Sequence, residues 1–191
     1  MLTDFSRQTL AGLRILIVLT VLLGVVYPVA VWAAGRAFAD RADGQLLHHD
    51  GEVVGSRLLG QNFEGDTWFH PRPSANGYDT LASAPSNLGP SNPDLLAAIE
   101  ERRAAVAEAE DVDPARVPAD ALTASGSGLD PHISPAYALL QAGRVAAANG
   151  LTPEKVRRLI DAYTEGPVLG FLGVEGVNVV ELNLAISRAA H

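Results

Sequence analysis

Apolar residues are concentrated near the start of the chain. Residues 15–34, ILIVLTVLLGVVYPVAVWAA, carry no charged side chain, and Arg14 and Arg36 bracket them. A helix rises about 1.5 Å per residue, so roughly 20 apolar residues cross the ~30 Å hydrocarbon layer of a membrane. The pattern therefore predicts a transmembrane helix over residues 15–34, preceded by a short flank of residues 1–14.

A cleaved signal peptide is the alternative interpretation of this segment. Residues Val31–Ala33 and Ala37–Ala39 both resemble small-residue cleavage sites. However, the apolar part of a signal peptide is usually only ~7–15 residues long, and this run is longer. We therefore expect the helix to be retained as a membrane anchor.

The charges beside the span predict its orientation. Arg7 and Arg14 lie in the N-terminal flank, and basic residues next to a span favour the cytoplasmic side. Arg36 and Arg41 follow the span and reduce the asymmetry between its two ends. The short flank still favours residues 1–14 in the cytoplasm and residues 35–191 outside the membrane.

A hairpin and a long irregular segment follow the span. Asp50-Gly51 lies between two apolar runs, which indicates a β-hairpin because a type I′ turn needs positive φ at both central residues. Residues 60–93 hold so many prolines and glycines that they exclude a long helix or a central strand. The segment also carries aromatic residues to bury, so we expect ordered, irregular structure that suits contact with another protein. Its residues of interest are Phe63, Trp68, Phe69, Arg72 and Tyr78.

Three later segments carry helix start and stop signals. The first is DLLAAIEERRAAVAEAE after Asn92-Pro93, the second runs from Ser134-Pro135 to Asn149-Gly150, and the third runs from Thr152 to about Thr164. The C-terminal NVVELNLAISRAA is ambiguous, because its apolar residues alternate as in a strand whereas Asn178 and Glu181 resemble a capping box. We favour a helix there. The predicted fold is α+β: one transmembrane helix, then a single extracytoplasmic α+β domain with a hairpin and several helices.

Composition limits the chemistry that the chain can carry out. There is no cysteine, which excludes disulfides and thiolate metal sites, and the net charge of −8 argues against a nucleic-acid surface. Lys155 is the only lysine, and it lies in neither a P-loop nor a phosphorylatable Asp-Lys-Thr-Gly motif. The sequence contains no G-x-S-x-G elbow and no H-E-x-x-H zinc motif.

Residues 123–135, TASGSGLDPHISP, form a segment dense in polar side chains that has several interpretations. Ser127, Asp130 and His132 are the residue types of a hydrolase triad, although known triads draw their members from separate elements. Asp130 and His132, together with a distant His70 or Asp79, have the side chains of a metal site.

Two other interpretations need no catalysis. The backbone N–H groups of Ser125–Gly128 suit a phosphate cradle. Alternatively the segment is structural: Asp130-Pro131 initiates a turn, His132 packs against it, and Ser134 is the N-cap of the next helix. We favour the structural interpretation.

Six blocks follow the single span in a fixed order. They are GSRLLGQNF, WFHPRPSA, SNLGPSNPDL, VPADALTASGSGLDPHISPA, QAGRVAAANGL and NVVELNLA. This order resembles the C subunit of the Kdp potassium-transporting ATPase along essentially the whole chain. The resemblance implies a non-catalytic accessory subunit of a high-affinity, ATP-driven potassium import pump in the bacterial inner membrane. The implied partners are a channel-like potassium subunit, a P-type ATPase subunit and a very small hydrophobic peptide, and the complex handles ATP and potassium.

The family is described as a catalytic chaperone that raises the ATP affinity of the pump subunit. The resemblance implies nucleotide binding at a serine-glycine sequence and a downstream glutamine, which here are Ser125, Gly126, Ser127, Gly128 and Gln141. A cytoplasmic N-terminus would place this loop outside, where cytoplasmic ATP does not reach it. We therefore expect a structural or partner-contact role for the loop. The alternative is an anchored exported hydrolase or metal-binding protein built on Ser127, Asp130 and His132.

Overall fold

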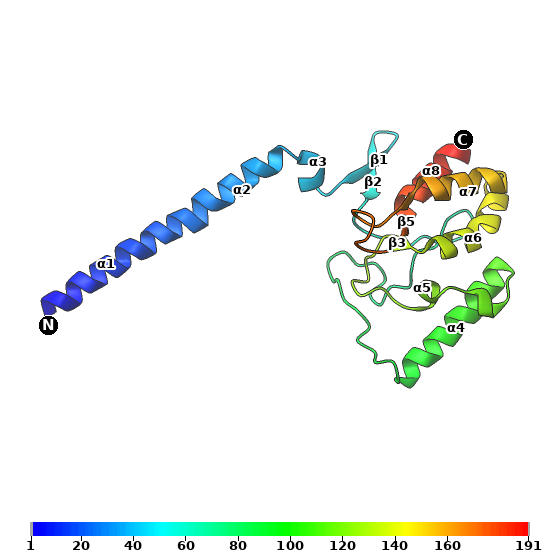
Figure 1. Cartoon of the computed structure of the whole chain (residues 1–191), viewed down its shortest axis with the longest axis horizontal. Coiled ribbons are helices and arrows are strands. Elements are labelled where there is room, and N and C mark those ends of the chain that lie inside the picture. The colour runs from blue at the N-terminus through cyan, green and yellow to red at the C-terminus, as the bar shows by residue number, and fades with distance from the viewer. Residues whose placement is uncertain (1, 191) are drawn as a thin grey trace. The chain divides into compact units, whose positions relative to one another are not determined.

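The computed structural model describes residues 2–190 and divides into two compact units (Figure 1). The first unit ends at Gln45, and the second begins at Leu46.

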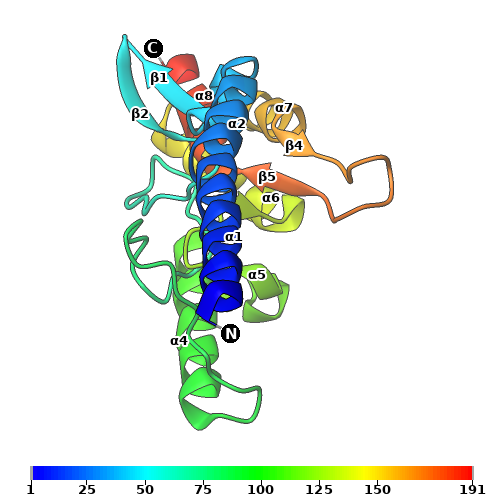
Figure 2. The ribbon, with the colours of Figure 1, turned by 90° about the vertical axis from the view of Figure 1, so that its left-hand side faces the viewer.

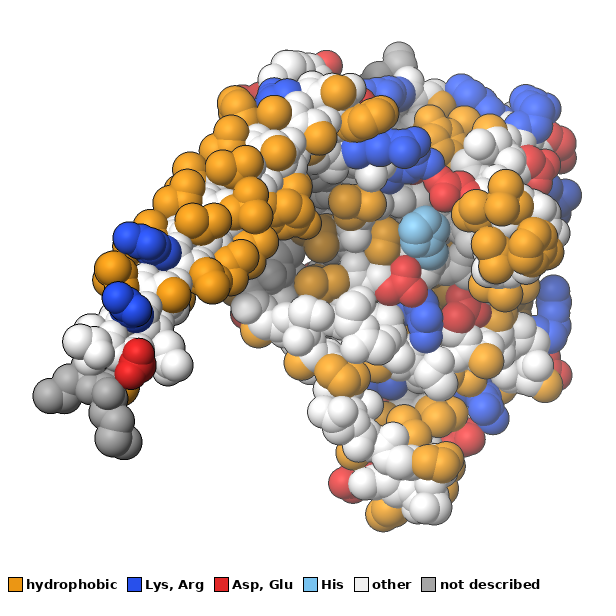
Figure 3. Space-filling model, turned by 60° about the vertical axis from the view of Figure 1, so that its left-hand side comes forward, with side chains coloured by type: hydrophobic (Ala, Val, Ile, Leu, Met, Phe, Trp, Pro, Cys, Tyr) orange, Lys and Arg blue, Asp and Glu red, His pale blue; other side chains and the backbone are white. Residues whose placement is uncertain are grey.

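The first unit is an almost uninterrupted helix. α1 (Leu2–Val21), a π-helical turn η1 (Leu22–Val26) and α2 (Tyr27–Arg36) form one rod (Figures 1 and 2), and a short α3 (Ala39–Ala42) follows. From Thr3 to Arg36 the rod has 34 residues, or about 50 Å of length. Apolar side chains cover it (Figure 3), and it is the one helix within residues 2–190 that is long and apolar enough to cross a membrane.

The π-helical turn lies directly before Pro28. A proline has no N–H group, and its ring collides with the carbonyl four residues earlier in an α-helix, here that of Gly24. In the π turn the Tyr27 N–H donates to the Leu22 carbonyl, which lies five residues back rather than the four residues of an α-helix. The helix is therefore locally widened where the proline would otherwise break it, and it continues through the predicted span.

The second unit begins with the predicted hairpin. β1 (Leu46–His49) and β2 (Glu52–Ser56) are antiparallel. Between them, Asp50 and Gly51 have φ values of 50° and 86°. Both are positive, as a type I′ turn requires, which confirms the prediction.

Three helices of the second unit begin where their capping residues predict. Each of the three starts with a proline after an N-cap residue whose side chain accepts a backbone N–H group. They are α4 (Pro93–Glu110) after Asn92, α6 (Pro135–Ala148) after Ser134, and α7 (Pro153–Ala162) after Thr152. Between α4 and α6 lie the short 3₁₀ helix η2 (Pro114–Arg116) and α5 (Ala119–Leu122).

Three very short strands form a second sheet. The spatial order is β3 (His132–Ile133), β5 (Gly176–Asn178) and β4 (Thr164–Glu165), and both neighbouring pairs are antiparallel. The sequence did not predict this sheet, because strands of two or three residues are too short to show an alternating pattern.

The C-terminal segment is a strand for three residues and a helix thereafter. β5 leads directly into α8 (Val179–Ala190). The Asn178 side-chain oxygen accepts the N–H groups of Val180 and Glu181 at 3.1 and 3.2 Å. An N-cap residue satisfies the first turn of a helix in this way, so the favoured helix is confirmed.

The core of the second unit lies among its last three helices and the second sheet. α6 packs against α7, α7 packs against α8, and β5 contacts both α6 and α8 (Figure 1). The largest apolar side chains of this core are almost fully buried: Phe69, Ile133, Val145, Val156, Ile160, Val177, Leu182 and Ile186.

Two buried side-chain amides attach the irregular segment between β2 and α4 to this core. The Asn183 amide, on α8, accepts the Phe69 N–H at 2.8 Å and donates to the Phe69 carbonyl at 3.0 Å. The Gln141 amide, on α6, accepts the His70 N–H at 2.7 Å and donates to the His70 carbonyl at 3.1 Å. Each amide therefore pairs with a residue's backbone as a neighbouring strand would, although no strand is present at this position.

Arg144 makes a second attachment close by. Its Nε pairs with Glu110 at 2.9 Å, and the two side chains are only 9% and 3% exposed. The same guanidinium donates to the carbonyls of Asp66 and Trp68 at 2.8 and 2.9 Å. Burial raises the pKa of Glu110, and the Arg144 charge opposes that effect. Arg144 thus joins α4, α6 and the irregular segment.

We expect Asn183→Ala to destabilise the second unit. Removing the amide leaves two backbone groups of Phe69 unpaired in the core, at a cost of about 1–3 kcal/mol for each. Chemical denaturation of the full chain in detergent, followed by circular dichroism, would measure this loss. The control is Asn62→Ala, because exposed Asn62 bonds only to Glu64 and should cost no more than about 0.5 kcal/mol. Equal losses in the two variants would contradict the attachment.

Candidate functional site

The serine-glycine segment lies in a loop between α5 and β3 and is held by its own hydrogen bonds. The Ser127 hydroxyl accepts the Leu129 N–H at 3.0 Å, and the Gly128 N–H donates to the Ser125 carbonyl at 3.3 Å. The Ser125 N–H donates to the Pro73 carbonyl at 3.1 Å, and the Ser125 side chain is buried. Two of the four N–H groups that a phosphate cradle would use, those of Ser125 and Gly128, are therefore already paired within the protein.

The irregular segment donates hydrogen bonds to this loop. Three successive loop carbonyls each accept one hydrogen bond from it: Ser127 from the Ser83 hydroxyl at 2.9 Å, Gly128 from the Ser74 hydroxyl at 2.8 Å, and Leu129 from the Gly60 N–H at 2.8 Å. The two loops therefore stabilise each other, without a regular element in either.

Gln141 lies on α6 and is completely buried. Its amide bonds to the His70 backbone, and its oxygen also accepts a hydrogen bond from Arg144 at 2.9 Å. None of these bonds involves Ser125–Gly128. Nucleotide binding by this set of residues stays a prediction, and the contacts described here are those of a structural residue.

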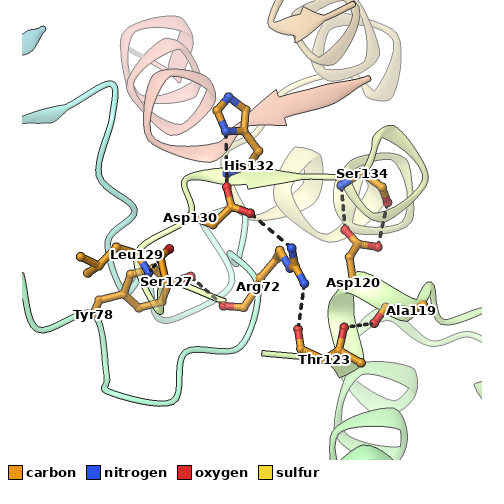
Figure 4. A network of polar contacts seen from close by, with 10 residues as sticks. All are labelled: Arg72, Tyr78, Ala119, Asp120, Thr123, Ser127, Leu129, Asp130, His132 and Ser134. Atoms are coloured by element: carbon orange, nitrogen blue, oxygen red, sulfur yellow. Dashed lines mark hydrogen bonds and ion pairs between the residues drawn. The ribbon is translucent and has the colours of Figure 1, made fainter. Parts of the chain in front are cut away.

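Asp130 lies at the centre of a charged network (Figure 4). One carboxylate oxygen accepts the His132 backbone N–H at 3.0 Å and lies 3.4 Å from His132 Nδ1. The other pairs with the Arg72 guanidinium at 3.3 Å. Burial acts to raise the pKa of Asp130, but the hydrogen bonds from His132 and the Arg72 charge outweigh it, so the pKa is lowered. The same carboxylate raises the pKa of His132, against the effect of burial.

Arg72 connects this network to the irregular segment. Its guanidinium also donates to the Thr123 carbonyl at 3.4 Å. Its own carbonyl accepts the Tyr78 hydroxyl at 2.6 Å. Burial raises the pKa of Tyr78 to about 12, so the phenol keeps its proton as a donor. The predicted turn at Asp130 is confirmed, because the Asp130 carboxylate accepts the His132 N–H. Arg72 joins this turn to the irregular segment.

Ser134 is confirmed as the N-cap of α6. Its hydroxyl accepts the Tyr137 N–H at 3.0 Å. Asp120, on α5, accepts both the Ser134 N–H at 2.7 Å and the Ser134 hydroxyl at 2.9 Å (Figure 4). The sequence reasoning missed Asp120, since an acidic residue in a four-residue helix gives no local signal of a partner fourteen positions away.

The hydrolase alternative is not favoured by this geometry. Among residues 2–190 no hydrogen bond joins Ser127 to His132, and Figure 4 shows their side chains set apart. A triad needs the serine against the imidazole.

The geometry does not favour the metal-site alternative either. His70 Nε2 lies 2.9 Å from the Gly65 carbonyl, and burial and the Arg144 charge lower the pKa of His70. The Asp79 carboxylate accepts the Leu81 N–H. In the described part of the chain, no three His, Asp or Glu side chains are placed to hold a metal ion.

The aromatic pair before Arg72 has two different environments. Phe69 is completely buried and belongs to the core, whereas Trp68 is partly exposed and lies 5.8 Å from the Phe63 ring, centroid to centroid. Of the two, only Trp68 has surface to offer to a partner.

We expect substitution of the two glycines of the serine-glycine segment to change stability by different amounts. Gly128 has a φ of 71°, and a Cβ there would lie 2.3 Å from Asn76 Oδ1 and 3.1 Å from the Ala84 carbonyl. We expect Gly128→Ala to lower the free energy of unfolding by about 1–3 kcal/mol. Gly126→Ala is the matched control, because nothing lies within 4 Å of a Cβ at Gly126; the expected change is below about 1 kcal/mol. Thermal unfolding of the two variants would test this, and equal stability would contradict a structural role for the segment.

The chain is similar to known proteins along almost its whole length. The family described as "K+-transporting ATPase, c chain" matches residues 9–188. A "Potassium-transporting ATPase KdpC subunit" of Kineococcus radiotolerans is 58% identical, covering 99% of this chain and 97% of its own length. The protein of the same name from Mycobacterium tuberculosis (strain H37Rv) is 51% identical, covering 95% and 98%. That of Cereibacter sphaeroides (strain KD131) is 50% identical, covering 93% and 95%. The chain therefore belongs to the KdpC family of c chains, which are accessory rather than catalytic subunits of the K+-transporting ATPase.

Proposed function

We propose that this subunit carries out no chemistry and holds a folded extracytoplasmic domain against its partner subunits to complete the pump. The observation that carries the proposal is the use made of the reactive side chains of residues 123–141. Asp130, Ser134 and Gln141 all hold backbone groups or capping positions of the protein itself. Side chains engaged in this way support a structural role for the domain, and the family resemblance indicates the complex that it joins.

The partners follow from what the chain lacks as well as from the resemblance. A single helix does not enclose an ion path, so the potassium path lies in a channel-like subunit, and ATP hydrolysis lies in a P-type ATPase subunit. A small hydrophobic peptide completes the proposed set. Gly24, Ala30 and Ala34 give the helix small residues for close packing against other membrane helices.

Any effect of this subunit on ATP affinity would then be transmitted through contacts. The proposed orientation places the second unit outside the membrane, away from cytoplasmic ATP. Four of the five candidate nucleotide-binding residues, Ser125, Ser127, Gly128 and Gln141, have backbone or side-chain groups engaged within the protein. We therefore infer that the chain stabilises the assembled pump rather than binding nucleotide itself.

The topology is testable because the chain contains no cysteine. Single cysteines at the exposed positions Ser6 and Glu108 would be treated with a membrane-impermeant thiol reagent in intact cells. We expect Glu108→Cys to be labelled and Ser6→Cys to be protected until the cells are lysed. Labelling of Ser6→Cys alone would invert the proposed topology. A mature chain that begins near Ala34 would instead indicate a cleaved signal peptide.

Deleting residues 1–34 should separate the domain from the pump. We expect the remaining chain to be recovered without its partner subunits, and cells carrying it to fail to grow at low potassium. Replacing residues 15–34 by an unrelated apolar helix of equal length is the control, and it shows how much of assembly depends on anchoring alone. Unchanged potassium uptake in cells without this chain would reject the proposed function.

A further inference from the structure

The loop between β4 and β5 is the most exposed apolar feature of the second unit. Residues 166–174, GPVLGFLGV, form a long excursion away from the two strands (Figure 2) and are called the apolar loop below. It exposes five large apolar side chains: Val168 (68%), Leu169 (80%), Phe171 (73%), Leu172 (51%) and Val174 (88%). Single exposed apolar residues are ordinary, but a contiguous group of this kind marks an interaction surface.

The tip of the apolar loop satisfies much of its own backbone. The Val168 N–H donates to the Leu172 carbonyl at 2.8 Å, and the Leu172 N–H donates back to the Val168 carbonyl at 3.0 Å. The Gly170 N–H donates to the Pro167 carbonyl at 3.0 Å. Taking the tip out of water would therefore leave these groups paired, which removes a large part of the usual cost of burying a loop.

Leu169, at the tip, has a φ of 55°. This left-handed conformation is unfavourable for a bulky residue, and strain of this kind gathers at ligand-binding and switch regions. In the isolated chain the strain is not offset by burial, because the Leu169 side chain is 80% exposed. An occupant that covers Leu169 would supply the missing burial.

The base of the apolar loop is fixed to the domain. β4 and β5 pair antiparallel, with Thr164 opposite Val177. Arg57 pairs with Glu165 at the end of β4 and, through Nε at 3.0 Å, with Glu181 on α8. A loop whose base is held in this way loses less conformational freedom on binding than a free one, so it is preorganised to bind.

A groove of about 570 Å³ runs beside the apolar loop. Val168, Leu172 and Val174 line it on the loop side. Arg72, Asp130 and His132, the charged network described above, contribute polar groups to it. The projecting loop and the adjacent groove thus form one continuous surface, and the candidate site residues lie next to the apolar side chains.

The charges around the apolar loop favour a protein over a lipid surface. There is no Lys or Arg from residue 159 to residue 187, and Glu175 flanks the loop. The two arginines near its base are already paired with carboxylates, Arg57 with Glu165 and Arg72 with Asp130. Elements that bind membranes combine apolar residues with Lys and Arg that contact anionic headgroups. A carboxylate in the position of Glu175 is repelled by such a surface, whereas it matches Lys or Arg at the rim of a protein pocket.

We propose that the apolar loop inserts into an apolar pocket, rimmed by Lys or Arg, on the extracytoplasmic face of a membrane-embedded subunit of the same pump. Leu169 and Phe171 are the anchors of this contact, because a few buried apolar residues dominate most interfaces. The proposal rests on the extracytoplasmic placement of the second unit proposed above and names the element that makes the contact.

The double variant Leu169→Ser/Phe171→Ser tests the anchors in the full complex. Both side chains are exposed, so the thermal unfolding midpoint of the purified subunit should not change. Recovery of the partner subunits with the chain in mild detergent should fall by ~10-fold or more. The matched control is Leu96→Ser, which removes a leucine that is 53% exposed on α4 and should leave recovery unchanged. Full recovery with the double variant would overturn the proposal.

Site-specific crosslinking distinguishes the two classes of occupant. A benzophenone amino acid replaces Phe171, or Leu96 as the control, in the complex in native membranes. A crosslink from position 171 to a pump subunit, without one from position 96, supports the proposal. Crosslinks only to lipid, or none to protein, would overturn it.

A charge-reversal variant tests the proposed basic rim of the partner's pocket. Glu175→Lys should lower recovery of the partner subunits several-fold at low salt and less at high salt, because a like charge would face the rim and salt screens it. Unchanged recovery at low salt would contradict a basic rim. If the loop variants assemble normally while deletion of residues 1–34 still prevents assembly, the proposed function stands and this inference fails.

Discussion

Two neutral amides hold together a domain in which the long stretch between β2 and α4 has little regular structure. Gln141 comes from α6 and Asn183 from α8, and they bond to the backbones of the adjacent residues His70 and Phe69. The irregular segment is therefore attached to both helices at one place, where the Phe69 ring fills the core. A buried amide has no charge to lose, so this attachment does not titrate over the physiological pH range. Buried polar groups of this kind stabilise a structure when they are hydrogen-bonded, and here both the oxygen and the nitrogen of each amide are bonded.

The polar loop after α5 depends on that attachment. Once Phe69 and His70 are held, Arg72 reaches Asp130, and two serines that follow Arg72 reach the carbonyls of Ser127 and Gly128. The side chains that look catalytic in the sequence are thus the contacts between two loops that have no ladder of backbone hydrogen bonds to join them. Hydrogen bonds from hydroxyls and an ion pair between a carboxylate and a guanidinium join the two loops in place of the backbone pairing of a β-sheet.

Local sequence signals predicted most of the regular elements, but they did not predict contacts between residues far apart in the sequence. The proline-opened helices, the Asp50-Gly51 turn and the cap at Asn178 each depend on residues within a few positions of one another. The amide pairs join residues 71 and 114 positions apart, and no local pattern specifies such partners. Similarly, the run PVLGFLGV is equally compatible with a buried core segment, and only the structure shows that it faces outward. The roles of Ser134 and Asp130 were predictable because caps and turns are local, whereas Asp120 and Arg144 were not.

The length of the first helix limits how it can lie in a membrane. A 34-residue helix is about 50 Å long, whereas the hydrocarbon layer is ~30 Å thick. Helices in membranes are inclined to the normal by at most about 40°, which shortens the reach of this helix to only about 38 Å. Inclination therefore cannot absorb the excess, and at least one turn must stand in the headgroup region or in water. Asp4, Ser6 and Arg7 are the residues suited to that position. A helix of this length that spans a membrane therefore presents a few residues of already folded backbone beyond the lipid, so a protein that binds them there has no ordering step to make.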